Sequence, residues 1–262
     1  MVFIYKKKIP FFENYRISNK PWPWEENPDL WRETLKKTLK GIAFNILLIQ
    51  VTMLYLDTLS NFNIKFSEAD FPSVWTHIWQ IFLFMVVEDF TFFLMHSLLH
   101  QKPLYWIHKQ HHEYKVTVSL AAEYSHPIEF LLANIVPTGI GFRVLSLFYP
   151  VHMSTVFMWV FIRVWETTDG HCGYEWSWSV FRLLPMSGSA EYHNFHHSHN
   201  VGNYSSFFTW WDTIFGTNKH YFEYKSRKER EEYLNKLRLE YQANKKKDLE
   251  KNCPMILEDK DA

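Results

Sequence analysis

Three histidine clusters constrain the fold of this chain more than any other feature. Residues 96–100 read HSLLH, residues 108–112 read HKQHH, and residues 191–200 read EYHNFHHSHN. In a helix, side chains three or four positions apart lie on one face, so each cluster places two or three imidazoles on one turn. We therefore expect each cluster to aim its rings at a single point, as metal binding requires, and the fold to bring the clusters together.

The number of clustered histidines predicts two metal ions. Imidazole is a good ligand for zinc, copper, iron and nickel, and one ion accepts about four to six ligands. The clusters supply eight: His96, His100, His108, His111, His112, His193, His196 and His197. Two further candidates are His171, in ETTDGHCGYE, and His126, in AEYSHPIE. His199 is two residues from His197, which is the wrong spacing for a shared helical face, and we expect no metal there.

Carboxylates flank the histidines along the chain. Imidazoles that bind a metal usually donate their second N–H to a carboxylate or a carbonyl oxygen. The candidates for this supporting role are Asp89, Glu123, Glu129, Glu166, Asp169 and Glu191. For any one of them, an interfacial charge or a helix cap is an equally good explanation.

Four apolar segments predict membrane helices. They cover residues 41–56, 74–95, 128–149 and 151–165, and each contains few or no charged residues. A helix needs about 20 mostly apolar residues to cross a bilayer, and these segments reach that length only if their polar ends extend to the interface. The alternative is a soluble all-α protein in which these segments are core helices.

The distribution of basic residues predicts the topology. Lysine and arginine concentrate before residue 41 and after residue 218, whereas the loop 57–73 is acidic. Basic loops stay on the cytoplasmic side, so both ends and all three histidine clusters should lie on that face. We expect an all-α membrane protein with four transmembrane or re-entrant helices and a histidine-rich helical cap on the cytosolic side. The single domain 1–262 would comprise an irregular arm (1–33), membrane helices with a histidine loop (34–170), the cap (171–218) and a charged helical tail (219–262).

The chemistry favoured by this pattern is oxidation by an iron pair. A closed zinc site takes about four ligands, whereas this chain offers at least eight histidines at a membrane surface. A di-iron centre with O2 can remove hydrogen from an unactivated C–H bond, and its substrate here would be a lipid. Aromatic residues make up 19% of the chain and could line the path of that lipid. The net charge of zero gives no reason to expect nucleic acid, and Cys172 and Cys253 make no disulfide framework.

The three motifs resemble the HxxxH…HxxHH…HxxHH pattern of the fatty acid hydroxylase/sterol desaturase superfamily. The flanking stretches VEDFTFFLMHSLLH, YWIHKQHHEYK, AEYSHPIE, RVWETTDGHCGYE and GNYSSFFTWWDTIFGT are similar to those of C-4 methylsterol monooxygenases. The resemblance, over roughly residues 80–220, implies four membrane helices and a cytosolic histidine cap over two irons. It also implies O2, electrons from NAD(P)H through cytochrome b5 or a reductase, and stepwise oxidation of a sterol C-4 methyl group in the endoplasmic reticulum. The eight clustered histidines, with His171, would be the ligands.

Some residues depart from the resemblance. Ser97 stands where relatives usually have arginine, Phe92 where methylsterol oxidases usually have a further histidine, and Cys172 where serine is common. The final residues, ILEDKDA, lack the dilysine ending of many relatives. Three alternatives therefore remain: another sterol desaturase or dealkylase, a fatty acyl hydroxylase, or a structural subunit of a larger membrane complex, for instance in the mitochondrial inner membrane.

Overall fold

The computed structural model describes residues 2–59 and 62–252, which are mostly helical. Cys253 and the final residues ILEDKDA, on which two of the sequence arguments rest, lie outside these ranges. The chain forms two compact units, Met1–Asn218 and Lys219–Ala262. The second unit contains the long charged helix α12 (Lys219–Asn252), at the position of the predicted helical tail.

Two helical segments are long and apolar enough to cross a membrane. They are α5 (Val74–Leu99) and the run Pro127–Ser146. The other two apolar segments lie in α4 (Pro28–Leu59) and α9 (Met153–Gly170), which do not meet the same combination of length and hydropathy in the described residues. The structure therefore supports a mostly helical chain with two of the four predicted membrane helices.

Helix α5 exposes a continuous apolar face. Its side chains at 74, 75, 78, 79, 82 and 83 are large, hydrophobic and exposed, and Trp75 is 77% exposed. Positions on the other side of the same helix, including Phe84 and Glu88, are fully buried. An exposed apolar stripe of this length is rare on soluble proteins, so the pattern fits a helix with one face towards lipid.

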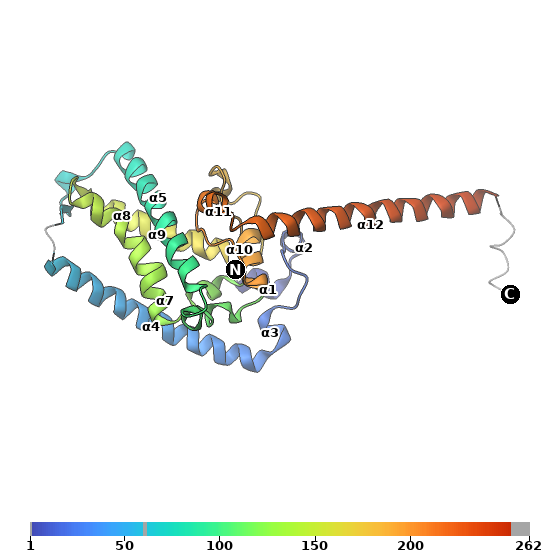
Figure 1. The fold of residues 1–262 in the computed structure, drawn as a ribbon, viewed down its shortest axis with the longest axis horizontal. Helices are drawn as coiled ribbons and strands as arrows, with labels where there is room; N and C mark the ends of the chain where they lie inside the picture. The colour runs from blue at the N-terminus through green and yellow to red at the C-terminus, as the bar shows by residue number, and fades with distance from the viewer. Residues whose placement is uncertain (1, 60–61, 253–262) are drawn as a thin grey trace. The chain divides into compact units, whose positions relative to one another are not determined.

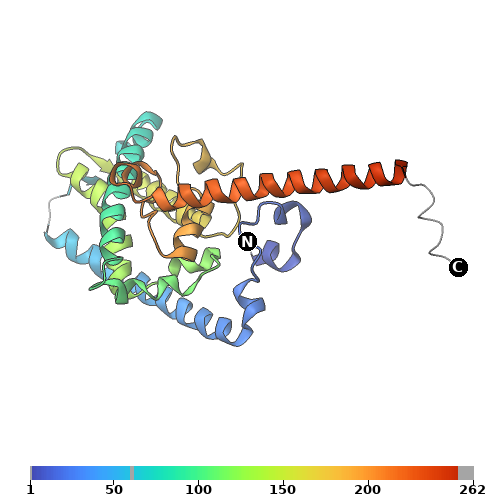
Figure 2. The same cartoon turned by 45° about the vertical axis from the view of Figure 1, so that its right-hand side comes forward.

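The run Pro127–Ser146 packs against α5, and the two lie side by side in both views (Figures 1 and 2). The run comprises α7 (Pro127–Glu129), the π-helix η4 (Phe130–Ile135) and α8 (Val136–Ser146). Pro137 has no N–H and its ring clashes with the carbonyl four residues earlier, which explains why the preceding turn widens. Gly141 allows close approach, because a Cβ there would lie 3.1 Å from the Phe84 Cα.

The predicted irregular arm contains helices. Before α4 lie α1 (Val2–Lys7), α2 (Pro10–Glu13) and α3 (Pro23–Glu26), and α4 begins at Pro28, inside the predicted arm. The arm is aromatic, and Trp22 is fully buried in a cluster with Tyr5 and Tyr174. The Tyr5 hydroxyl donates to the Cys172 carbonyl at 2.8 Å, so the arm packs against the segment that follows α9.

The remaining elements are short. Two parallel strands, β1 (Ile64–Lys65) and β2 (Val151–His152), pair Ile64 with Val151. The remaining short helices are η1 (Glu68–Asp70), α6 (Tyr105–His108), η2 (His111–Glu113), η3 (Ser119–Glu123), η5 (Val180–Leu183), α10 (Ala190–His199) and α11 (Trp210–Phe215). The clustered histidines and His171 lie at the C-terminal end of α5, in α6 and η2, at the C-terminal end of α9, and in α10.

Candidate metal centre

Nine histidines come together in two adjacent groups. Group A contains His96, His100, His108, His112 and His196. Group B contains His111, His171, His193 and His197. Within each group, one nitrogen from every ring lies within 4.8 Å of the others. All eight histidines of the three sequence clusters are present, and His171 joins them.

The expectation that each cluster aims its rings at one point is wrong for the two HxxHH clusters, whereas His96 and His100 of HSLLH both belong to group A. In the cluster on α10, His193 and His197 belong to group B, whereas His196 belongs to group A. Successive residues on a helix are about 100° apart, so His196 lies about 60° to one side of His193 and His197 about 40° to the other. An HxxHH sequence on one turn therefore supplies histidines to two neighbouring groups.

The loop cluster divides in the same manner. His108 closes α6, and His111 and His112 lie in η2, so this cluster is not one continuous α-helix. His108 and His112 nevertheless belong to group A, and His111 belongs to group B. The loop and α10 thus contribute to both groups, whereas α5 supplies only group A and His171 only group B.

Hydrogen bonds at Nδ1 fix the orientation of the group A rings. His96 Nδ1 donates to the Tyr204 carbonyl at 2.9 Å, and His108 Nδ1 donates to the Glu129 carboxylate at 2.8 Å. A neutral imidazole carries one N–H, so each of these rings is left with a lone pair on Nε2. The two Nε2 atoms face each other at 3.1 Å with no proton between them. A cation between them would resolve this contact.

Group B has the same arrangement. His171 Nδ1 donates to the Thr167 carbonyl at 2.7 Å, and His197 Nδ1 donates to the Tyr114 carbonyl at 3.1 Å. Their Nε2 atoms lie 3.2 Å apart. Burial lowers the pKa of His171 to about 3, so the ring stays neutral at physiological pH. Burial likewise holds the pKa of His197 well below its usual value.

The spacing of these nitrogens fits metal coordination. Neighbouring Nε2 atoms in the two groups lie 2.9–3.2 Å apart. A metal–nitrogen bond of about 2.1 Å places two ligands at right angles about 3.0 Å apart. Neutral imidazole donors suit a first-row transition metal. The five histidines of group A exceed the four ligands of a closed tetrahedral zinc site.

Among the predicted carboxylates in the described residues, Glu129 makes a direct hydrogen bond to a grouped histidine, His108. Asp89 instead accepts the backbone N–H groups of Ser206 and Phe208, at 3.0 and 3.1 Å, and so holds the loop that carries the Tyr204 carbonyl. Glu123 is partly buried and has no hydrogen bond to a histidine in the described residues.

The other predicted carboxylates belong to ion pairs or helix ends. Glu166 pairs with Arg163 at 2.9 Å, and Arg163 also pairs with Glu88 at 2.5 Å. Asp169 pairs with Arg182 at 3.4 Å. The Glu191 backbone N–H, in the first turn of α10, donates to a Glu175 side-chain oxygen at 2.7 Å.

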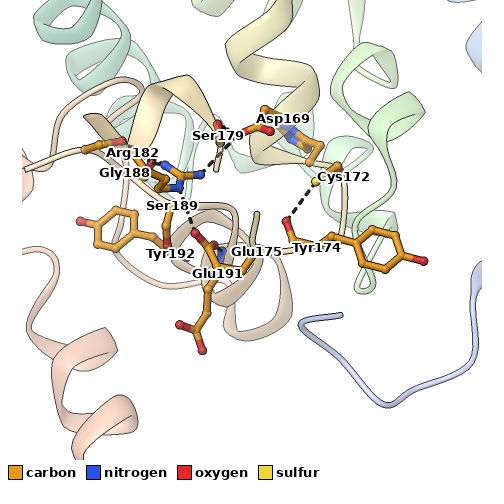
Figure 3. A network of polar contacts seen from close by, with 12 residues as sticks. Asp169, Cys172, Tyr174, Glu175, Ser179, Arg182, Gly188, Ser189, Glu191 and Tyr192 are labelled. Atoms are coloured by element: carbon orange, nitrogen blue, oxygen red, sulfur yellow. Dashed lines mark hydrogen bonds and ion pairs between the residues drawn. The ribbon is translucent and has the colours of Figure 1, made fainter. Parts of the chain in front are cut away.

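Arg182 links the C-terminal end of α9 to the segment just before α10 (Figure 3). It donates to Asp169 near the end of α9, to Glu175 at 2.9 Å, and to the Gly188 carbonyl just before α10. Ser189 caps α10 by accepting the Tyr192 N–H at 2.9 Å. No sequence motif marks Arg182, whose one visible signal is that it is a lone cation in the apolar stretch SVFRLLP.

His126 lies outside both groups. Its Nδ1 accepts the Ile128 N–H at 3.2 Å, so it caps α7, and its ring packs against Trp106. His199 also lies outside both groups and stacks on Phe195. Phe92, the departure noted next to the first cluster, lies against His96 with ring centroids 5.0 Å apart.

An apolar cavity borders the centre. It is lined by Ile42, Asn45, Ile46, Ile49, Glu123, Phe130, Asn134, Ile135, Thr138, Gly139, Phe142, Val160, Arg163, Val164 and Thr167. These residues come from α4, η3, the run Pro127–Ser146 and α9. Thr167 orients His171 through its carbonyl, and Phe130 follows Glu129, which orients His108. The cavity therefore reaches a residue that orients group B, and one of its lining residues is adjacent in the chain to the carboxylate that orients His108.

Comparison with known proteins agrees with this site. The family model described as Fatty acid hydroxylase matches residues 81–217, which include all nine grouped histidines. The chain belongs to the fatty acid hydroxylase family. This confirms the family that the sequence motifs indicated. No solved structure matches the chain.

Similar proteins cover most of this chain. Methylsterol monooxygenase 1 of Gallus gallus is 35% identical over 229 residues, which are 86% of this chain and 73% of that protein. The C-4 methylsterol oxidase of Schizosaccharomyces pombe is 31% identical, over 91% of this chain and 75% of its own length. Methylsterol monooxygenase 2-2 of Arabidopsis thaliana is 41% identical, over 57% of this chain and 56% of its own length.

Proposed function

We propose that this protein is a membrane di-iron monooxygenase that oxidises the C-4 methyl group of a sterol. The observation that carries the proposal is the pair of histidine groups, in which neighbouring Nε2 atoms lie 2.9–3.2 Å apart. Nine neutral nitrogen donors in two groups suit two iron ions better than one closed zinc site. The similarity to methylsterol monooxygenases over most of the chain supports the substrate class.

Group A would hold one iron, and group B would hold the other. When bound, an iron pair activates O2 for attack on an unactivated C–H bond. Four of these rings, those of His96, His108, His171 and His197, donate the Nδ1 proton to a carbonyl or carboxylate oxygen. Their Nε2 lone pairs are therefore oriented before metal binds. Burial lowers the pKa of His100 to about 2 and that of His111 to about 4, so protons do not compete for these nitrogens near pH 7.

The apolar cavity would receive the lipid. Its walls are mainly aliphatic and aromatic, as in sites for apolar ligands. The run Pro127–Ser146, one of the two candidate membrane helices, forms one wall, so a lipid could enter from the bilayer. Thr167 lines the cavity and its carbonyl accepts from His171, so this end of the cavity lies near group B.

The remaining parts of the proposal follow the family resemblance. Electrons would come from NAD(P)H through cytochrome b5 or a reductase. The protein would reside in the endoplasmic reticulum membrane, with the histidine cap in the cytosol. His126 remains outside the proposed ligand set, because it caps α7.

The first test is metal content together with turnover. Full-length protein purified in mild detergent from iron-supplied cells should contain close to two irons per chain. It should then oxidise a 4-methylsterol with O2, NAD(P)H and a reductase–cytochrome b5 mixture. Protein that binds no metal, or binds two irons and leaves the sterol unchanged, would contradict the proposal.

A matched pair of variants on α10 sharpens this test. His196→Ala removes a group A ligand, and we expect it to lower iron content and abolish turnover. His199→Ala alters a histidine on the same helix that belongs to neither group, and it should retain both irons. Equal iron loss in the two variants would indicate a general effect on α10 and refute the assignment.

A further inference from the structure

Asn45 is a buried amide without a partner in the wall of the lipid cavity. It lies on α4 and is 2% exposed. Both Nδ2 and Oδ1 are shielded from solvent and have no hydrogen-bond partner among the described residues. Among the cavity-lining residues in the described part of the chain, Asn45 alone has buried side-chain polar atoms in this state. An unpaired buried amide destabilises a fold, so its retention here indicates a ligand that pairs with it.

The other polar side chains around the cavity differ from Asn45. Arg163 is paired with Glu88 and Glu166. Asn134 is only partly buried, as is Glu123. The surroundings of Asn45 on its own helix are apolar, since Ile42, Ile46 and Ile49 line the same cavity. The cavity thus offers one fully buried amide, with its donor and acceptor both unpaired, within a mainly apolar wall.

The geometry points to Asn45 as the residue that recognises the hydroxyl group of the sterol. A sterol carries a single hydroxyl on a rigid apolar ring system. An amide can accept a hydrogen bond from this hydroxyl through Oδ1 and donate one to it through Nδ2, which satisfies both of its free functions. Since this inference rests on the proposed function, its test separates failure of the residue assignment from failure of the substrate class.

Recognition of this kind sets specificity. A site built around a buried polar group rejects an analogue that lacks the matching group, because the polar atoms then stay unpaired. Asn45 would therefore favour a 4-methylsterol over the same molecule without its hydroxyl. It would also fix the sterol along the cavity and so determine which carbon lies beside the histidine groups.

The test is equilibrium binding rather than turnover. Full-length, iron-loaded protein in lipid nanodiscs would be titrated with a radiolabelled 4-methylsterol and with its 3-deoxy analogue. We expect the wild type to bind the hydroxysterol about tenfold more tightly than the analogue. Asn45→Leu should bind both with similar affinity, and Asn45→Ser, which keeps a small polar group, should retain part of the preference.

Asn134→Leu is the control, because Asn134 lines the same cavity. It should keep the wild-type preference, and melting temperatures should show that all variants are folded. If Asn45→Leu keeps the preference, or Asn134→Leu loses it instead, the assignment to Asn45 is overturned while the sterol function stands. If the wild type binds neither molecule, both the inference and the sterol substrate are overturned.

Discussion

Glu129 offers the sharpest test of how the protein supports its metal centre. Its carboxylate accepts from His108 Nδ1 at 2.8 Å, and both side chains are at most 4% exposed. His108 belongs to group A and makes no contribution to group B. Loss of such a supporting partner typically lowers metal affinity about 10–100-fold, which corresponds to about 1.4–2.7 kcal/mol.

Two substitutions should divide this range. Glu129→Gln removes the charge but leaves an amide oxygen that can accept the same proton, so we expect a loss near tenfold. Glu129→Leu leaves the His108 N–H without an acceptor in a buried site, so we expect a loss near a hundredfold. In both variants the ion in group B should bind as in the wild type.

The assay is anaerobic titration of metal-free protein with Fe(II), followed by calorimetry that resolves the two binding events. Glu123→Gln is the control, because Glu123 is also a carboxylate near the centre but makes no hydrogen bond to a histidine in the described residues. Wild-type affinity in both Glu129 variants would refute the reasoning, and so would equal weakening of both ions.

Three further predictions follow from other parts of the structure. Gly141→Leu should destabilise the protein by about 1–3 kcal/mol, because the new side chain must enter the contact with Phe84. Gly41→Leu is the control, because a Cβ there would have no neighbour within 4 Å, and this variant should unfold at the wild-type temperature or above. Arg182→Gln should lower the melting temperature, because it removes the charged contacts of Arg182 with Glu175 and Asp169, which link the ends of α9 and α10. During chelator titration this variant should release the group B ion before the group A ion. In the metal-free protein, several grouped histidines have lowered pKa values, and that of His171 is about 3. The unfolded chain therefore binds more protons below about pH 6.5, and the free energy of unfolding should fall as the pH drops below this value. Urea unfolding at pH 7 and pH 5 measures this, and an unchanged midpoint would contradict it.

The histidine spacing in the sequence was sufficient to predict most of the proposed ligands. HSLLH, HKQHH and HNFHH place imidazoles at helical intervals, and all eight of these residues enter the two groups. His171 was a candidate from its place after an apolar segment, and it joins group B. Such inferences succeed because helical periodicity is a local property that can be counted along the chain.

The division of ligands between two groups was decided by the tertiary structure. Spacing alone suggested that His193, His196 and His197 share one point, but His196 turns towards α5 and the other two towards His171. The direction of a ring matters only relative to the elements around it. The sequence contains the periodicity of α10 but not the positions of its neighbours.

The acceptors that orient the rings were also hidden in the sequence. His96 bonds the carbonyl of Tyr204, 108 residues away, and His197 bonds that of Tyr114, 83 residues away. Every residue has a backbone carbonyl, so no side-chain pattern marks the ones that serve. The sequence by itself determined which side chains can bind metal and which segments are apolar. Only the packing of distant segments decided which lone pairs face each other, because that depends on contacts between residues far apart along the chain.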